Sequence, residues 1–209
     1  MKTLLITTAA VFVVSLLDSP VLGAGWFWDL GNGVGFAAFS GLLYLSLASA
    51  KGIHYEAHRH LAYAVLLLAA LHVFWLLLGD AVVVEYLRPG APLYMWVGLA
   101  GFALLNLLML VSLPSYRRRV HRSHAGFRHW HRGFAIAVTV GAAWHILMSG
   151  HYLRSPIQWL AFVALVAFAC LAYRFDWHNN DRERRSWHRY LGVAMGAATL
   201  FALVRNIPS

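Results

Sequence analysis

Seven apolar segments, each close to the length that crosses a lipid bilayer, constrain this chain of 209 residues more than any other feature. The hydrocarbon core of a bilayer is about 30 Å thick, so a spanning α-helix needs roughly 20 mostly apolar residues. Charged residues make up only 12% of the chain, against about a quarter in a soluble domain. We therefore predict an all-α, polytopic transmembrane bundle of about seven spans, with residues 1–209 forming a single domain. The segments are residues 3–22, 34–50, 58–79, 94–113, 131–150, 157–173 and 188–204.

The first segment fits two interpretations. It combines Lys2, an apolar stretch and small residues near Gly23, as a cleaved signal peptide does. Cleavage would leave six spans. We favour a retained helix because the apolar stretch is long.

The distribution of positive charge predicts the orientation. With the N-terminus inside, the inner segments carry 14 of the 17 Lys and Arg residues, and the outer segments carry only Arg88, Arg154 and Arg205. Cytoplasmic loops are enriched in Lys and Arg, so this alternation predicts an inside N-terminus. Topology also accounts for the net charge of +9, and we expect no nucleic-acid partner.

Three glycines, Gly31, Gly33 and Gly35, stand immediately before or at the start of the second segment. They mimic part of a dinucleotide-binding fingerprint, but no strand precedes them and a βαβ unit has no room. We predict a flexible loop for them.

An internal repeat places histidines in two matched pairs. Residues 58–72 align without gaps with residues 131–145, and eight of the fifteen positions are identical. Both copies begin with His-Arg and end with His, so that His58 and His72 correspond to His131 and His145. A helix turns through about 1,400° in 14 residues, nearly four full turns, and rises about 21 Å. Each pair therefore shares one helix face, and the parallel third and fifth spans bring the pairs to matching depths.

The chemistry of these histidines favours heme iron. An ionisable residue within a span is costly and marks function by default. Two imidazoles that face each other across a bundle suit heme, whereas zinc requires a tetrahedral set of ligands. We predict two b-type hemes, the inner one on His58 and His131 and the outer one on His72 and His145.

Nearby residues carry weaker signals. Arg59 and Arg132 each follow an inner ligand and would either pair with heme propionates or act as ordinary positive-inside anchors. His60 and His129 lie about 200° around the helix from their neighbouring ligands, so we expect them to face away. Alanines and glycines in the repeat would leave room for a macrocycle or serve close helix packing equally well.

These features resemble the ferric reductase-like transmembrane domain, whose members include ferric reductases, NADPH oxidases and the heme subunit of periplasmic methionine sulfoxide reductase. The matching features are the two His-Arg pairs, the 14-residue histidine spacing and the arginine-rich stretch at residues 115–119. The resemblance covers residues 34–173 and leaves 188–204 as an extra span. It implies that a flavin reduces the inner heme and that the outer heme passes electrons outward.

Two departures limit what the resemblance implies. Family reductases often carry a flavin and nicotinamide domain, which is not visible in this sequence, so FAD would act only through a separate partner. The methionine sulfoxide reductase subunit does not keep all four histidines, so we do not adopt its substrate.

The sequence thus predicts a heme-binding electron conduit, a component of a membrane oxidoreductase, in the inner membrane of a bacterium. The expected partners are membrane lipid, an inner-side flavoprotein or quinol, and an outer-side acceptor protein or metal. One alternative is a cytochrome b subunit of a larger respiratory or photosynthetic complex. A metal or ion transporter is another, although such proteins usually break their helices at mid-membrane.

Overall fold

The computed structural model describes residues 2–17, 23–48, 55–120, 123–172 and 187–207, and every regular element in these ranges is helical. This confirms the all-α prediction. The elements are α1 (Lys2–Leu16), α2 (Trp26–Ala48), α3 (Tyr55–Gly79), α4 (Ala81–Val84), the 3-10 turn η1 (Glu85–Leu87), α5 (Leu93–Ser112), α6 (Pro114–Val120), α7 (His124–Ser149), α8 (Pro156–Leu171) and α9 (Trp187–Asn206).

Four helices are long and apolar enough to cross a membrane, namely most of α2, most of α3, and all of α5 and α7. They indicate an integral membrane protein. The first and sixth predicted segments form the shorter apolar helices α1 and α8, of 15 and 16 residues, and the last forms the 20-residue α9. The span count of seven and the inside N-terminus remain predictions.

The predicted glycine loop is wrong, because Gly31, Gly33 and Gly35 lie inside α2. The helix begins at Trp26, eight residues before the predicted segment. Each glycine meets another helix so closely that an added Cβ would crowd it: Gly31 meets Trp75, Gly33 meets Ala198 and Gly35 meets His72. Close helix approach, not chain flexibility, explains these glycines.

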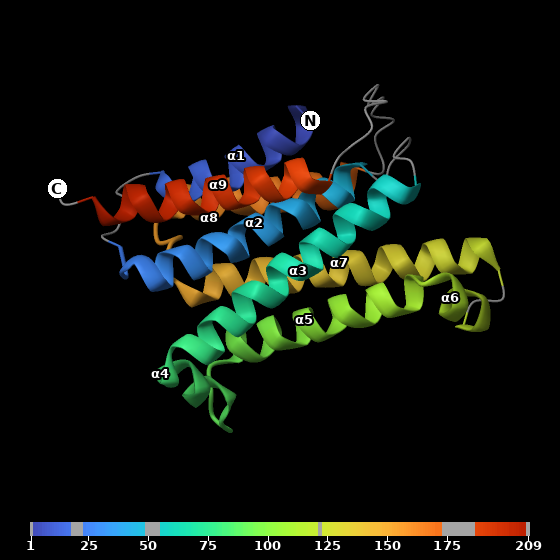
Figure 1. Ribbon diagram of the computed structural model, residues 1–209, viewed down its shortest axis with the longest axis horizontal. Coiled ribbons are helices and arrows are strands. Elements are labelled where there is room, and N and C mark those ends of the chain that lie inside the picture. The colour runs from blue at the N-terminus through green and yellow to red at the C-terminus, as the bar shows by residue number, and fades with distance from the viewer. Residues whose placement is uncertain (1, 18–22, 49–54, 121–122, 173–186, 208–209) are drawn as a thin grey trace.

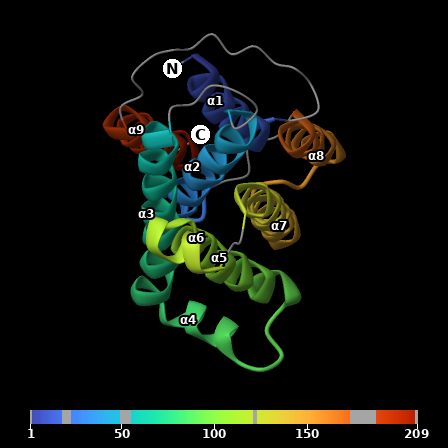
Figure 2. The same cartoon turned by 90° about the vertical axis from the view of Figure 1, so that its right-hand side faces the viewer.

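Helix α2 is the centre of the bundle. It packs against α1, α3, α7, α8 and α9 (Figures 1 and 2). Its inward side chains include Phe36 and Phe39, which are almost fully buried and form ring contacts with Phe12, Phe201 and Phe162 from other helices. Helix α1 begins and α9 ends at opposite ends of the bundle, and α1 begins towards the end where α6 lies (Figure 1).

Three antiparallel helix pairs account for most of the packing between the described helices: α5 with α7, α2 with α3, and α2 with α9 (Figure 1). In Figure 1, α5 and α7 run side by side below α2, and α3 runs diagonally in front of α7; Figure 2 shows α3 and α7 on opposite sides of the bundle. Direct packing between α3 and α7 is sparse in the described part of the chain. The two histidine-bearing helices therefore face each other through side chains, with little contact between their backbones.

Candidate metal centre

The structure places the four predicted ligands on two helices, His58 and His72 on α3 and His131 and His145 on α7. The rings of His58 and His131 lie with centroids 6.1 Å apart and planes tilted by 58°. The other two ligands, His72 and His145, lie further along α3 and α7. Within each helix the two histidines are separated by 14 residues, about 21 Å along the axis. The structure thus brings His58 and His131 together, and these two residues correspond to each other in the repeat.

The ring of His72 is fixed by α2. Its Nδ1 lies 2.9 Å from the carbonyl oxygen of Gly31. One helical turn later, a Cβ at Gly35 would lie 2.8 Å from the same Nδ1 and 3.0 Å from Cε1. Only glycine leaves room at that position, so α2 supplies both an acceptor for the imidazole and a flat surface beside it.

The ring of His145 is fixed by α5 in the same way. Its Nδ1 lies 2.9 Å from the carbonyl oxygen of Tyr94. A Cβ at Gly98, four residues further on, would lie 2.7 Å from Nδ1 and 3.0 Å from both Cε1 and Cγ. The same arrangement therefore occurs in both helix pairs, α2 with α3 and α5 with α7. In each pair, a backbone carbonyl at position i and a glycine at position i+4 of one helix hold a histidine of the other helix.

His131 is anchored by a side chain. Its Nδ1 lies 3.1 Å from Ser112 Oγ. That hydroxyl donates its proton to the carbonyl oxygen of Leu108 at 2.6 Å, so towards the imidazole the oxygen acts as an acceptor.

These hydrogen bonds fix the tautomer of three histidines. A carbonyl oxygen can only accept, so Nδ1 carries the proton in His72 and His145, and Ser112 imposes the same tautomer on His131. The lone pair is then on Nε2. Metal-binding histidines commonly donate the second N–H to a backbone carbonyl or similar acceptor, which orients the ring and raises its basicity. Three imidazoles thus present an unprotonated Nε2, the atom through which a histidine of this tautomer can bind a metal.

The donor set suits a metal that takes two axial imidazoles. Metal–imidazole bonds are about 2 Å long, so two rings on opposite sides of one metal have centroids roughly 6 Å apart. The 6.1 Å between His58 and His131 matches this separation. Among the described residues no group of three or more His, Cys, Asp and Glu side chains gathers around a common point. The arrangement fits heme better than a tetrahedral zinc site.

The structure also describes the other predicted residues on α3 and α7. Arg59 forms an ion pair of 2.6 Å with Glu56, one turn earlier on α3. Arg132 is exposed and lies in the first half of α7. His60 and His129 are exposed as well, in agreement with their predicted angular offset.

Sequence reasoning missed the residues that hold the rings, namely Gly31, Gly35, Tyr94, Gly98 and Ser112. One signal was present: Gly98 and Ser112 are 14 residues apart, the spacing of the histidines that they contact. A helix packed antiparallel to α7 along its length would carry its contacts at the same interval.

A scan of protein-family models finds no match to this chain, and searches of curated proteins and of solved structures find none either. The resemblance to ferric reductase-like domains therefore rests on the histidine repeat and the arginine-rich stretch of this sequence. The anchoring of the rings is a property of this structure and does not depend on that resemblance.

Proposed function

We propose that this chain is a di-heme b-type membrane cytochrome that carries electrons across the bilayer, from a donor on the inner side to an acceptor on the outer side. The observation that supports the proposal best is the matched anchoring of His72 and His145 through Nδ1 at 2.9 Å. Anchoring of this kind leaves both Nε2 atoms available for one metal.

Heme iron, when bound, supplies reversible one-electron chemistry that no amino-acid side chain here provides. The chain contributes two pairs of axial imidazoles and the groups that orient them. If His58 with His131 and His72 with His145 each held one heme, this use of two histidines per heme would favour electron transfer over oxygen binding. Contact between the α3 and α7 backbones is sparse in the described residues, as a cofactor held between those helices would require.

The topology of the proposal follows the distribution of charge. We place the N-terminus inside a bacterial inner membrane and count seven spans, with α1, α8 and α9 as the three beyond the four long apolar helices. His58 and His131 then belong to the inner heme and His72 and His145 to the outer heme. Arg59 and Arg132 lie near the inner level, where a propionate would compete with Glu56 for Arg59.

The proposed partners follow from this direction of transfer. A flavoprotein carrying FAD, or membrane quinol, would reduce the protein from the inner side. An acceptor protein or a metal ion would be reduced on the outer side. In this role the chain is the heme component of a membrane oxidoreductase.

The decisive experiment is a reduced-minus-oxidised absorption spectrum of the purified full chain, with heme quantified per polypeptide. We expect b-type bands and two hemes per chain. A colourless protein that cannot be loaded with heme would refute the proposal and would favour a transporter.

Ligand replacement assigns each heme. His72→Ala should remove one heme and leave the other reducible, and His58→Ala should remove the other. His60→Ala is the matched control, because His60 is an exposed histidine on the same helix. Loss of both hemes from a folded His72→Ala protein, or loss of neither, would contradict the ligand assignment.

A further inference from the structure

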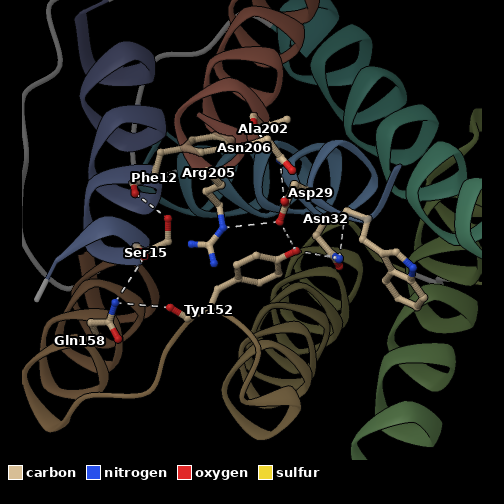
Figure 3. A network of polar contacts seen from close by, with 10 residues as sticks. Phe12, Ser15, Asp29, Asn32, Tyr152, Gln158, Ala202, Arg205 and Asn206 are labelled. Atoms are coloured by element: carbon tan, nitrogen blue, oxygen red, sulfur yellow. Dashed lines mark hydrogen bonds and ion pairs between the residues drawn. The ribbon is translucent and has the colours of Figure 1, made fainter. Parts of the chain in front are cut away.

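A buried polar cluster joins three helix ends on the side of the bundle away from α6 (Figure 3). The carboxylate of Asp29, near the start of α2, is its centre. Tyr152 Oη donates to Asp29 Oδ1 at 3.0 Å, and Asn206 Nδ2 donates to Oδ2 at 2.8 Å. Arg205 Nε lies 3.4 Å from Oδ1. Asn32 Nδ2 donates to Tyr152 Oη at 3.1 Å and closes the cluster.

The cluster is removed from solvent. Asp29 is 0% exposed, Arg205 5% and Tyr152 6%. The Arg205 guanidinium lies over the Tyr152 ring at 4.5 Å. Burial, together with the adjacent Asp29 carboxylate, raises the pKa of Tyr152 far above its ordinary value, so its hydroxyl remains a donor. Burying an ion pair is costly, and it often adds specificity of geometry more than stability.

The position of Arg205 is unusual for its charge. Counted by topology, it is one of only three positive residues on the outer side. Its side chain points into the bundle towards Asp29, not into solvent (Figure 3). The distribution of charge between the two sides of the membrane therefore does not explain Arg205, whereas its buried partner does.

The cluster is connected to His72 through the first turns of α2. Asp29 and Asn32 flank Gly31 on the first turns of α2, and the Gly31 carbonyl is the acceptor for His72. Any rotation or shift of this part of α2 moves that carbonyl relative to the imidazole. By holding Asp29 and Asn32, the cluster thus fixes the position of the Gly31 carbonyl that accepts from His72.

The cluster is also connected to α7, the helix that carries His145. Tyr152 lies three residues beyond the end of α7 and seven residues beyond His145. Its bonds to Asp29 and Asn32 tie the end of α7 to the start of α2. Helix α9 contributes Arg205 and Asn206 to the cluster. The Arg205 carbonyl also accepts a hydrogen bond from Gly23 N at 3.0 Å.

We infer that Asp29, Tyr152 and Arg205 are positioning residues for the outer pair of histidines. Helix α9 contributes to the site through this buried polar cluster, which we call the clamp. The inference rests on the proposed function, because it concerns how the outer heme is held. The clamp sets the relation between α2 and α7 and hence the angle and spacing of the imidazoles from His72 and His145. The inner pair, anchored at the other end of the helices, does not depend on it.

The test uses the full chain with heme bound and compares Tyr152→Phe with Tyr190→Phe. Each variant removes one buried hydroxyl, and the Tyr190 hydroxyl also ties α9 to α2, through the Ala37 carbonyl at 2.8 Å. The readouts are the midpoint potential and low-spin paramagnetic resonance signal of each heme. A further readout, which needs no heme, is hydrogen exchange of the amides of residues 26–35.

We expect Tyr152→Phe to shift the potential and resonance signal of the outer heme and to leave the inner heme unchanged. Amide exchange of residues 26–35 should also become faster, whether or not heme is bound. Tyr190→Phe should change neither outer-heme readout. Arg205→Met should lower outer-heme content below half of its normal value.

The outcomes separate this inference from the proposed function. An unchanged outer heme and unchanged exchange in Tyr152→Phe would overturn the inference while leaving a di-heme cytochrome intact. Equal shifts in both tyrosine variants would also overturn it. Absence of heme from the wild-type chain would instead overturn the proposed function, and the exchange experiment would still test the clamp. Should Arg205→Met not fold, the tyrosine variants decide.

Discussion

Replacing Gly98 with alanine tests the close approach of α5 to His145. The added Cβ would lie 2.7 Å from Nδ1 and 3.0 Å from Cε1 and Cγ, whereas ordinary contact begins at 3.4 Å. The ring must therefore retreat by about 0.7 Å. A retreat of that size would stretch the 2.9 Å bond between Nδ1 and the Tyr94 carbonyl beyond the roughly 3.2 Å limit of a good N–H···O bond.

The expected loss is one hydrogen bond that orients a ligand. Removing such a partner typically weakens metal binding about 10- to 100-fold, or roughly 1.4 to 2.8 kcal/mol. Gly101→Ala is the matched control, because it lies three residues further along the same helix and its Cβ would meet nothing within 4 Å. Both changes gain about 1 kcal/mol of helix propensity, which cancels in the comparison.

The assay is the outer-heme content of each purified protein, followed during extended dilution. Gly98→Ala should lose outer heme about 10 to 100 times more readily than Gly101→Ala, with the inner heme retained in both. Equal retention in the two variants would show that the close approach of α5 does not hold the ligand, and the reasoning would then be wrong.

Three further predictions follow from the same geometry. Gly35→Ala should weaken outer-heme binding to a similar extent through His72, because its Cβ would lie 2.8 Å from Nδ1 of that ring; heme quantification checks this, and normal retention would argue against it. Ser112→Ala removes the acceptor 3.1 Å from His131 Nδ1, so the midpoint potential of the inner heme should shift while that of the outer heme stays fixed, and a redox titration that resolves both hemes measures it. In a Cys170→Ser background, Arg154→Cys should react with a membrane-impermeant thiol reagent in intact cells and Ser115→Cys should not; the reverse pattern would exclude an inside N-terminus.

The histidine pairs are the part of the site that sequence alone could predict. Their 14-residue spacing is a local property of one helix, and the repeat extends it to a second helix of the same direction. The pairing of His58 with His131 then requires only that two parallel helices face each other. Periodicity and topology are sufficient for that step.

The groups that hold the rings could not be predicted in the same way. Gly31 and Gly35 matter because of where α2 crosses α3, which depends on the packing of two helix surfaces. A glycine-rich stretch ordinarily indicates a turn or loop, and tertiary packing overrides that tendency in α2. The Asp29 cluster was hidden for a related reason: its members lie far apart in the chain and only the fold brings them together.

The repeated arrangement of α2 with α3 and of α5 with α7 has a consequence for assembly. Each hairpin carries one imidazole at every level and orients its outer imidazole with its own backbone, yet neither hairpin can supply both ligands of a site. During synthesis the first hairpin would enter the membrane with the His72 ring already oriented, but a cofactor could be captured only after the second hairpin is in place. Under the proposed function, heme would then bind late, after both hairpins have formed, and would link them. A chain interrupted before α7 would be inserted into the membrane but would remain colourless.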